Sequence, residues 1–169
     1  KLPDEARANV YGRANDPDPT GYKDKGLIVA YGDDIYAVAD CLGVCRFVTR
    51  GFNSPHLLGY QDFCDSVAAA TGLEYTPASL RDVGRRTLDT ERLINAGFGL
   101  TRADDTLPKR YFDDPMPARK TKGHHVDREQ FQLMLDEYYA ERGWDADGRV
   151  SAERIAERDG LNDVIAGCS

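Results

Sequence analysis

The residues best suited to cofactor chemistry lie in one short segment, the D-x-x-G-x-C motif at residues 40–45. Cys45 follows a glycine that ends an apolar, helix-like run, so its thiolate would lie beside peptide N–H groups at a helix terminus. A thiolate in such a setting suits an iron–sulfur ligand, because hydrogen bonds to the sulfur tune the reduction potential of the cluster. Asp40 lies one helical turn earlier, where its carboxylate could accept hydrogen bonds from an amide- or amine-rich ligand. The motif therefore predicts a cofactor contact at a helix end.

Spacing alone leaves other interpretations of these residue types open. Cysteines are commonly small, buried packing residues, which is the plain alternative for Cys41 and Cys45. A zinc site is not favoured, because the chain has no C-x-x-C pair and its paired histidines lie far along the sequence. Residues 145–148 (DADG) look like the start of a calcium loop, but the glycine falls at the wrong position, which predicts a simple turn.

The histidines and one charged segment are weaker candidates for function. His56, His124 and His125 could act as general acids or bases, but loop histidines are more often solvated or hydrogen-bonded structural residues. Residues 101–110 are rich in Arg, Asp and Lys. We expect them to form a solvated surface held by internal Arg–Asp pairs unless the segment meets another domain.

Hydrophobic periodicity predicts a mainly α fold, an irregular helical domain of about five helices with long loops. Residues 26–42 place apolar side chains at three- and four-residue steps, and Gly43 supplies a C-terminal stop. Because Asp33 and Asp34 fall in the middle of this run, we expect the helix to begin near them, after an extended stretch at residues 26–31. Further helices are expected at residues 60–70, 77–97 and 127–143, and shortly after Ser151.

Two stretches lack a helical period. Residues 1–25 are rich in Asp, Pro, Gly and Asn, which predicts an irregular lead-in loop before a helical domain at residues 26–169. Residues 99–125 contain several prolines, which predicts a long irregular segment that is functional or packed across a neighbour.

Composition and charge argue against some classes of function. The 169 residues are 41% hydrophobic and 30% charged, as in an ordinary soluble globular protein. A net charge of −7 argues against a nucleic-acid or anionic-membrane surface. No window approaches the roughly 18 apolar residues that cross a bilayer, and residues 1–9 lack the apolar core of a signal peptide. The four cysteines fit a reducing, cytoplasmic location, and a first residue other than Met suggests a piece of a longer protein.

Several segments in series resemble the aldehyde:ferredoxin oxidoreductase family of tungsten-pterin enzymes. The D-x-x-G-x-C motif is followed by three segments similar to that family's C-terminal signature: residues 90–95 (TERLIN), 99–110 (GLTRADDTLPKR) and 134–145 (MLDEYYAERGWD). The resemblance covers about residues 26–150 in the right order. A series of motifs is more specific than any one of them and outweighs the packing interpretation of Cys45.

The resemblance implies a tungsten or molybdenum ion held between two pterins, with a 4Fe–4S cluster nearby. It implies that Cys45 is the fourth cluster ligand, that Asp40 hydrogen-bonds a pterin, and that the backbone near Val44 lies between the two cofactors. Cys41 occupies an x position and inherits no role. The family's C-x-x-C-x-x-x-C motif and N-terminal β domain are absent from the sequence. We therefore expect this chain to be inactive alone and to need the N-terminal remainder of the enzyme.

Two functional hypotheses follow from the sequence. In the first, the chain is the C-terminal helical part of an oxidoreductase that oxidises aldehydes to carboxylic acids and passes electrons to ferredoxin or a partner subunit. Within that class, the loop at residues 50–56 resembles the benzoyl-CoA reductase catalytic subunits, so reduction of an aromatic acyl thioester is the alternative reaction. In the second hypothesis, the chain is a cofactor-free helical interaction module whose cysteines are packing residues. No catalytic residue is predicted in either case.

Overall fold

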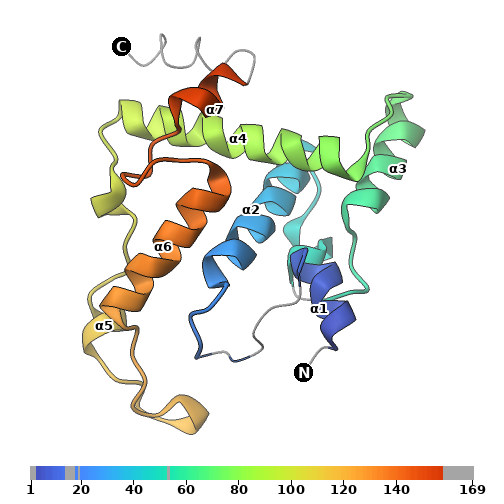
Figure 1. Cartoon of the computed structure of the whole chain (residues 1–169). Helices are drawn as coiled ribbons and strands as arrows, with labels where there is room; N and C mark the ends of the chain where they lie inside the picture. Colours follow the sequence, from blue (N-terminus) through green and yellow to red (C-terminus); the bar gives the residue numbers. More distant parts are fainter. Residues whose placement is uncertain (1–2, 14–17, 19, 53, 158–169) are drawn as a thin grey trace. The chain divides into compact units, whose positions relative to one another are not determined.

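The structure is a computed structural model that describes residues 3–13, 18, 20–52 and 54–157. These residues form seven α-helices, four short 3-10 helices and two isolated β-bridges. The α-helices are α1 (Asp4–Tyr11), α2 (Lys25–Cys41), α3 (Tyr60–Thr71), α4 (Pro77–Gly97), α5 (Arg110–Asp113), α6 (Arg128–Arg142) and α7 (Ala152–Ala156) (Figure 1). The 3-10 helices are η1 (Arg46–Val48), η2 (Arg50–Phe52), η3 (Arg102–Asp104) and η4 (Arg119–Thr121). The predicted mainly α fold with long loops is confirmed.

The contacts of the chain divide it into two compact units. Unit 1 comprises Lys1–Asn15 and Ile28–Arg92, and unit 2 comprises Asp16–Leu27 and Leu93–Ser169. The D-x-x-G-x-C motif belongs to unit 1. The domain boundary expected at residue 25 stays a prediction.

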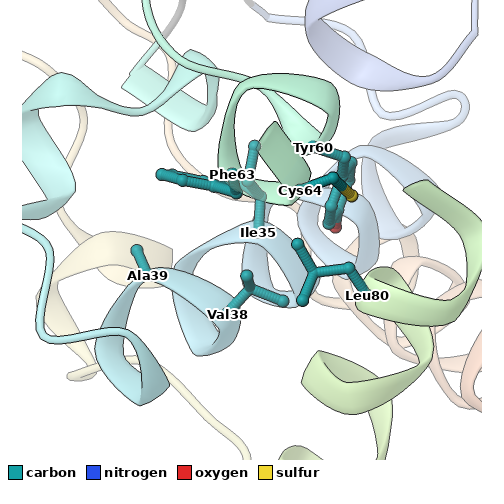
Figure 2. Packing of buried hydrophobic residues seen from close by; sticks show 7 residues of the cluster. All are labelled: Ile35, Val38, Ala39, Tyr60, Phe63, Cys64 and Leu80. Carbon is teal, nitrogen blue, oxygen red and sulfur yellow. The ribbon is translucent and has the colours of Figure 1, made fainter. Parts of the chain in front are cut away.

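The core of unit 1 is formed where α2, α3 and α4 meet (Figure 2). Three- and four-residue steps along α2 and α3 place apolar side chains on one face of each helix, as the sequence pattern predicts. The buried cluster consists of Ile35, Val38 and Ala39 from α2, Tyr60, Phe63 and Cys64 from α3, and Leu80 from α4. Cys64 is therefore a packing residue. This core anchors α2, the helix that leads into the motif.

Helix α2 is continuous from Lys25, so the expected extended stretch at residues 26–31 is wrong. The expectation rested on the two aspartates in the middle of the run. Asp34 is only 1% exposed, but the Nε atom of Arg81 in α4 donates to its carboxylate at 2.8 Å. A buried charge is tolerated when a partner of opposite charge compensates it, so Asp34 does not interrupt the helix.

The expectation of an irregular lead-in is wrong for Asp4–Tyr11, which form α1. Asp4 and Glu5 lie in its first turn, where negative charge interacts favourably with the helix dipole. Val10 is buried at 1% exposure, and Gly12 ends the helix with a φ of 72°. The prolines and aspartate at residues 16, 17 and 19, which prompted the loop prediction, lie outside the described residues.

The start and stop signals of α6 in unit 2 act as the sequence predicts. The Asp127 side chain accepts a hydrogen bond from the backbone N–H of Gln130 at 2.8 Å, and Gly143 ends the helix with a φ of 71°. The turn predicted at residues 145–148 is also confirmed, because Asp145 Oδ1 accepts from the N–H groups of Asp147 and Arg149. The segment at residues 99–125 is mostly irregular, although the one-turn helix α5 was not anticipated.

The charged segment at residues 101–110 is held differently from the expectation. Arg102 forms an ion pair with Asp136 of α6 at 2.7 Å, donates to the carbonyl of Ala146 at 2.8 Å and lies over the Tyr139 ring. These partners are all outside the segment, so the expectation of internal Arg–Asp pairs is wrong for Arg102. It instead ties the segment to α6.

Replacing Gly84 with alanine tests the close packing of α4 on α2. A Cβ atom at Gly84 would lie 2.4 Å from the Asp34 carbonyl oxygen and 3.0 Å from Val38 Cγ2. Because these are a backbone atom and a core side chain, we expect G84A to lower the free energy of unfolding by about 1–3 kcal/mol. Urea unfolding followed by circular dichroism measures the change.

Gly32 in α2 provides the matched control, since a Cβ atom there meets no atom within 4 Å. G32A should leave stability unchanged or raise it by up to about 1 kcal/mol, because alanine has the higher helix propensity. Equal changes in the free energy of unfolding for G84A and G32A would contradict the close packing of α4 on α2.

Candidate functional site

Helix α2 ends in a hydrogen-bonded turn that positions the D-x-x-G-x-C motif. Gly43 adopts a left-handed φ of 68°. Its N–H donates to the Asp40 carbonyl at 3.1 Å, and the Val44 N–H donates to the Ala39 carbonyl at 2.8 Å. This pair of bonds is the Schellman motif, which glycine at this position favours. The predicted helix stop at Gly43 is confirmed.

Cys45 lies directly after this turn and is exposed. It precedes η1, whose hydrogen bonds run from the Val48 N–H to the Cys45 carbonyl at 3.1 Å and from Thr49 to Arg46 at 3.0 Å. The N–H groups of Arg46 and Phe47 precede the first donor of this turn, so the turn itself does not use them. An accessible thiol beside such N–H groups has the chemistry of a cluster ligand.

The packing interpretation fails for both cysteines of the motif, because Cys41 is exposed as well. The Cys41 Sγ lies 3.4 Å from the hydroxyl oxygen of Thr87 in α4. This contact gives Cys41 a polar neighbour, whereas Cys64 is enclosed by apolar side chains.

Asp40 forms a two-pronged ion pair with Arg46. Arg46 Nε donates to Oδ1 at 3.1 Å, and Nη2 donates to Oδ2. These hydrogen bonds hold the pKa of the Asp40 carboxyl below its usual value, so the group is an anion at neutral pH. The Asp40 side chain is 49% exposed, which leaves it accessible to a ligand.

Arg46 is the residue near the motif that the sequence reasoning missed. Arg46 follows Cys45 in the sequence, but it lies outside the D-x-x-G-x-C pattern. The signal that could have found it is the turn itself, because a glycine stop reverses the chain and brings the next residues back toward the last turn of the helix.

Val44 is half-buried and packs against the core of unit 1. The Val44 N–H donates to the Ala39 carbonyl. The Val44 carbonyl is therefore the backbone group that remains for a cofactor contact. The side chain thus fixes the backbone between Asp40 and Cys45.

An apolar surface follows the motif. It consists of Phe47, Val48, Phe52 and Leu58, and we call it the post-motif surface. Phe47 is 68% exposed and makes an edge contact with Phe52 at a ring-centroid distance of 4.7 Å, while the Leu58 N–H donates to the Val48 carbonyl at 2.8 Å. Adjoining exposed apolar residues commonly mark an interaction site.

The three candidate histidines are divided between the two units. His56 is exposed on the loop after η2, in unit 1. His124 and His125 line an open cavity of about 750 Å³ in unit 2 together with apolar side chains such as Met116 and Phe131. The cavity contains neither Asp40 nor Cys45.

Within the described part of the chain, no three His, Cys, Asp or Glu side chains gather as a potential metal site. Nor does any helix among these residues have the length and apolarity needed to cross a membrane.

Comparison with known proteins gives a match over nearly the whole chain. The family model described as "Aldehyde ferredoxin oxidoreductase, domains 2 & 3" matches residues 4–161. The chain belongs to the aldehyde ferredoxin oxidoreductase family. This result confirms the resemblance found in the sequence motifs.

Individual relatives agree with the family. A tungsten-containing aldehyde ferredoxin oxidoreductase of Pyrococcus furiosus is 38% identical over 135 residues, which are 79% of this chain and 21% of the relative. A protein of the same description from Thermococcus kodakarensis is 39% identical over 73% of this chain and 19% of its own length. An aliphatic sulfonate oxidoreductase, WOR-like subunit, of P. furiosus is 27% identical over 79% of this chain. The chain thus spans about a fifth of the length of the curated relatives that it matches.

Thiol alkylation of the chain prepared without cofactors tests the placement of its cysteines. Cys41 and Cys45 are exposed, whereas Cys64 is 3% exposed and burial raises the pKa of its thiol. Because the thiolate is the reactive form, iodoacetamide should modify Cys41 and Cys45 in the folded chain and Cys64 only after unfolding. Peptide mass spectrometry measures each rate, and equal rates for Cys64 and Cys45 would contradict the structure.

Proposed function

We propose that this chain is the C-terminal helical part of a tungsten-pterin (or molybdenum-pterin), iron–sulfur oxidoreductase that oxidises aldehydes to carboxylic acids. The observation that carries the proposal is the end of α2, where an exposed thiol and an ionised carboxylate flank a turn fixed by Gly43. This segment lies inside the region matched by the family model. The relatives named as tungsten-containing aldehyde ferredoxin oxidoreductases support both the metal and the substrate class.

In this proposal Cys45 is one of four ligands of a 4Fe–4S cluster. The exposed sulfur, and the N–H groups at the start of η1 that the 3-10 turn does not use, fit a thiolate ligand. The described residues contain no group of three His, Cys, Asp or Glu side chains that could hold a metal, and the other three ligands are proposed to come from the rest of the enzyme.

Asp40 is proposed to orient a pterin by accepting hydrogen bonds from its N–H groups. A carboxylate has lone pairs on both oxygens, and hydrogen bonds to an ionised acceptor are stronger than those between neutral groups. The Val44 backbone, held against the core, lies between this acceptor and the Cys45 thiol.

The overall reaction is RCHO + H2O → RCOOH + 2 H⁺ + 2 e⁻. When bound, the metal-pterin would supply the two-electron chemistry of this reaction, and the cluster would supply single-electron transfer toward ferredoxin or a partner subunit. This chain would contribute the Cys45 ligand of the cluster and the Asp40 carboxylate that orients the pterin.

The remainder of the polypeptide is proposed to cover the post-motif surface. The chain spans only about a fifth of the length of its curated relatives, and the exposed apolar side chains of this surface begin at Phe47, two residues after Cys45. Covering this surface would also exclude water from the cluster.

Replacing Cys45 with alanine tests the ligand assignment. In the full-length enzyme, C45A should lower the iron content and the visible absorption of the cluster, because a 4Fe–4S cluster held by four thiolates is weakened when one of them is removed. C41A is the matched control, since Cys41 is also exposed but has no proposed role. An unchanged iron content in C45A would refute the assignment, and a full-length parent protein without iron would instead favour a cofactor-free interaction module.

Replacing Asp40 with alanine tests the pterin contact. We expect D40A to retain iron but to hold less pterin, because a hydrogen bond to a charged group contributes about 1.5–3 kcal/mol. Tungsten analysis and the fluorescence of the released, oxidised pterin measure occupancy. D113A is the control, because Asp113 is an exposed aspartate that is likewise paired with an arginine. Full pterin occupancy in D40A would contradict the role of Asp40.

A further inference from the structure

We infer that Arg46 is a positioning residue that holds the Asp40 carboxylate in the orientation in which it meets the pterin. This inference rests on the proposed function and assigns a role to a residue outside the D-x-x-G-x-C pattern. The planar guanidinium group of Arg46 donates one hydrogen bond to each carboxylate oxygen of Asp40.

Asp40 needs such a partner because of its place in the fold. It lies in the last turn of α2, and its side chain is about half exposed. An exposed side chain samples several rotamers, and fixing one of them costs conformational entropy when a ligand binds. A two-pronged contact with arginine selects one orientation before the ligand arrives, which lowers that cost.

Arg46 is itself held in place. Its guanidinium carbon lies 5.4 Å from the centroid of the Tyr36 ring, one helical turn before Asp40. Its backbone carbonyl accepts from both the N–H and the hydroxyl of Thr49, at 3.0 and 2.8 Å. Thr49 is completely buried, so the backbone that carries Arg46 is anchored to the interior of unit 1.

The ion pair does not exhaust Asp40 as an acceptor. Each carboxylate oxygen has two lone-pair sites, and Arg46 uses one hydrogen bond on each. The remaining sites can accept N–H groups of a pterin while the arginine stays bound. Asp40 therefore acts in this proposal as a clamped acceptor, and Arg46 acts through it.

Unit 2 contains a matched control for this arrangement. Arg128 pairs with Asp113 and lies over the Phe112 ring at 4.5 Å, with exposed side-chain fractions of 60% and 54% for the pair. The corresponding fractions for Arg46 and Asp40 are 56% and 49%. Both are arginine–aspartate pairs of similar exposure, but Arg128 donates to Asp113 through one nitrogen, whereas Arg46 uses two, and only the Arg46–Asp40 pair adjoins the motif.

The experiment compares R46A, R46K, D40A, the double variant D40A/R46A and R128A in the full-length enzyme. For each, iron, tungsten and pterin are quantified after purification, and the rate of pterin loss on incubation is followed by fluorescence. We expect R46A to retain iron and to lose pterin up to about tenfold faster than the parent enzyme. R46K should lie between them, because lysine keeps the charge but lacks the planar fork. R128A should behave like the parent.

The double variant separates positioning from a general structural effect. If Arg46 acts through Asp40, R46A adds nothing to the pterin loss of D40A, as a double-mutant cycle reveals. Additive effects, equal effects of R46A and R128A, or a parent-like R46A would each overturn the inference. A normal D40A would instead contradict the proposed pterin contact, and iron retention in C45A would contradict the cluster assignment, so the failures are distinguishable.

Discussion

At the end of helix α2, the N–H groups of Val44 and Gly43 donate hydrogen bonds to the carbonyl groups of Ala39 and Asp40. This turn can form because Gly43 adopts a left-handed conformation that is unfavourable for other residues. The chain therefore reverses between Asp40 and Cys45. The carboxylate stays on the last turn of the helix, the Val44 side chain returns to the core, and the thiol emerges on the surface. Every contact proposed for the motif depends on this reversal.

The position of the turn at residues 40–45 depends on how firmly helix α2 is held. Helix α2 is held by the apolar cluster with α3 and α4 (Figure 2), by the Asp34–Arg81 ion pair, and by the close approach at Gly84. These contacts lie on the turns before Asp40. A rigid element with a buried body and an exposed end can place ligand groups more reproducibly than a loop can, so the packing of unit 1 and the chemistry of the motif are connected.

The sequence contains enough local information to predict most helices and the motif, but not the pairing of side chains. Periodicity and capping residues correctly located α3, α4 and α6, because these signals act within a few residues. The continuity of α2 could not be predicted, since it depends on Arg81 compensating a buried aspartate from another helix. The partners of Arg46 and Arg102 were missed for the same reason. Helix α1 was missed because its polar composition resembles that of the loop residues after it.

The exposed aromatic residues after the motif bear on how the chain is used. A phenylalanine that stays in water forgoes the roughly 1.5–3 kcal/mol that burial of its side chain would contribute, and Phe47 and Phe52 are exposed beside each other. Neither ring belongs to the core of unit 1, so a further surface would be needed to bury them. In the proposed enzyme this surface is the remainder of the polypeptide. Covering the rings would stabilise the assembled form over the separate chain, since whatever binds only the folded state stabilises it. Because Phe47 lies two residues after Cys45, that cover would also lie near the thiol, so assembly and cluster ligation would support each other.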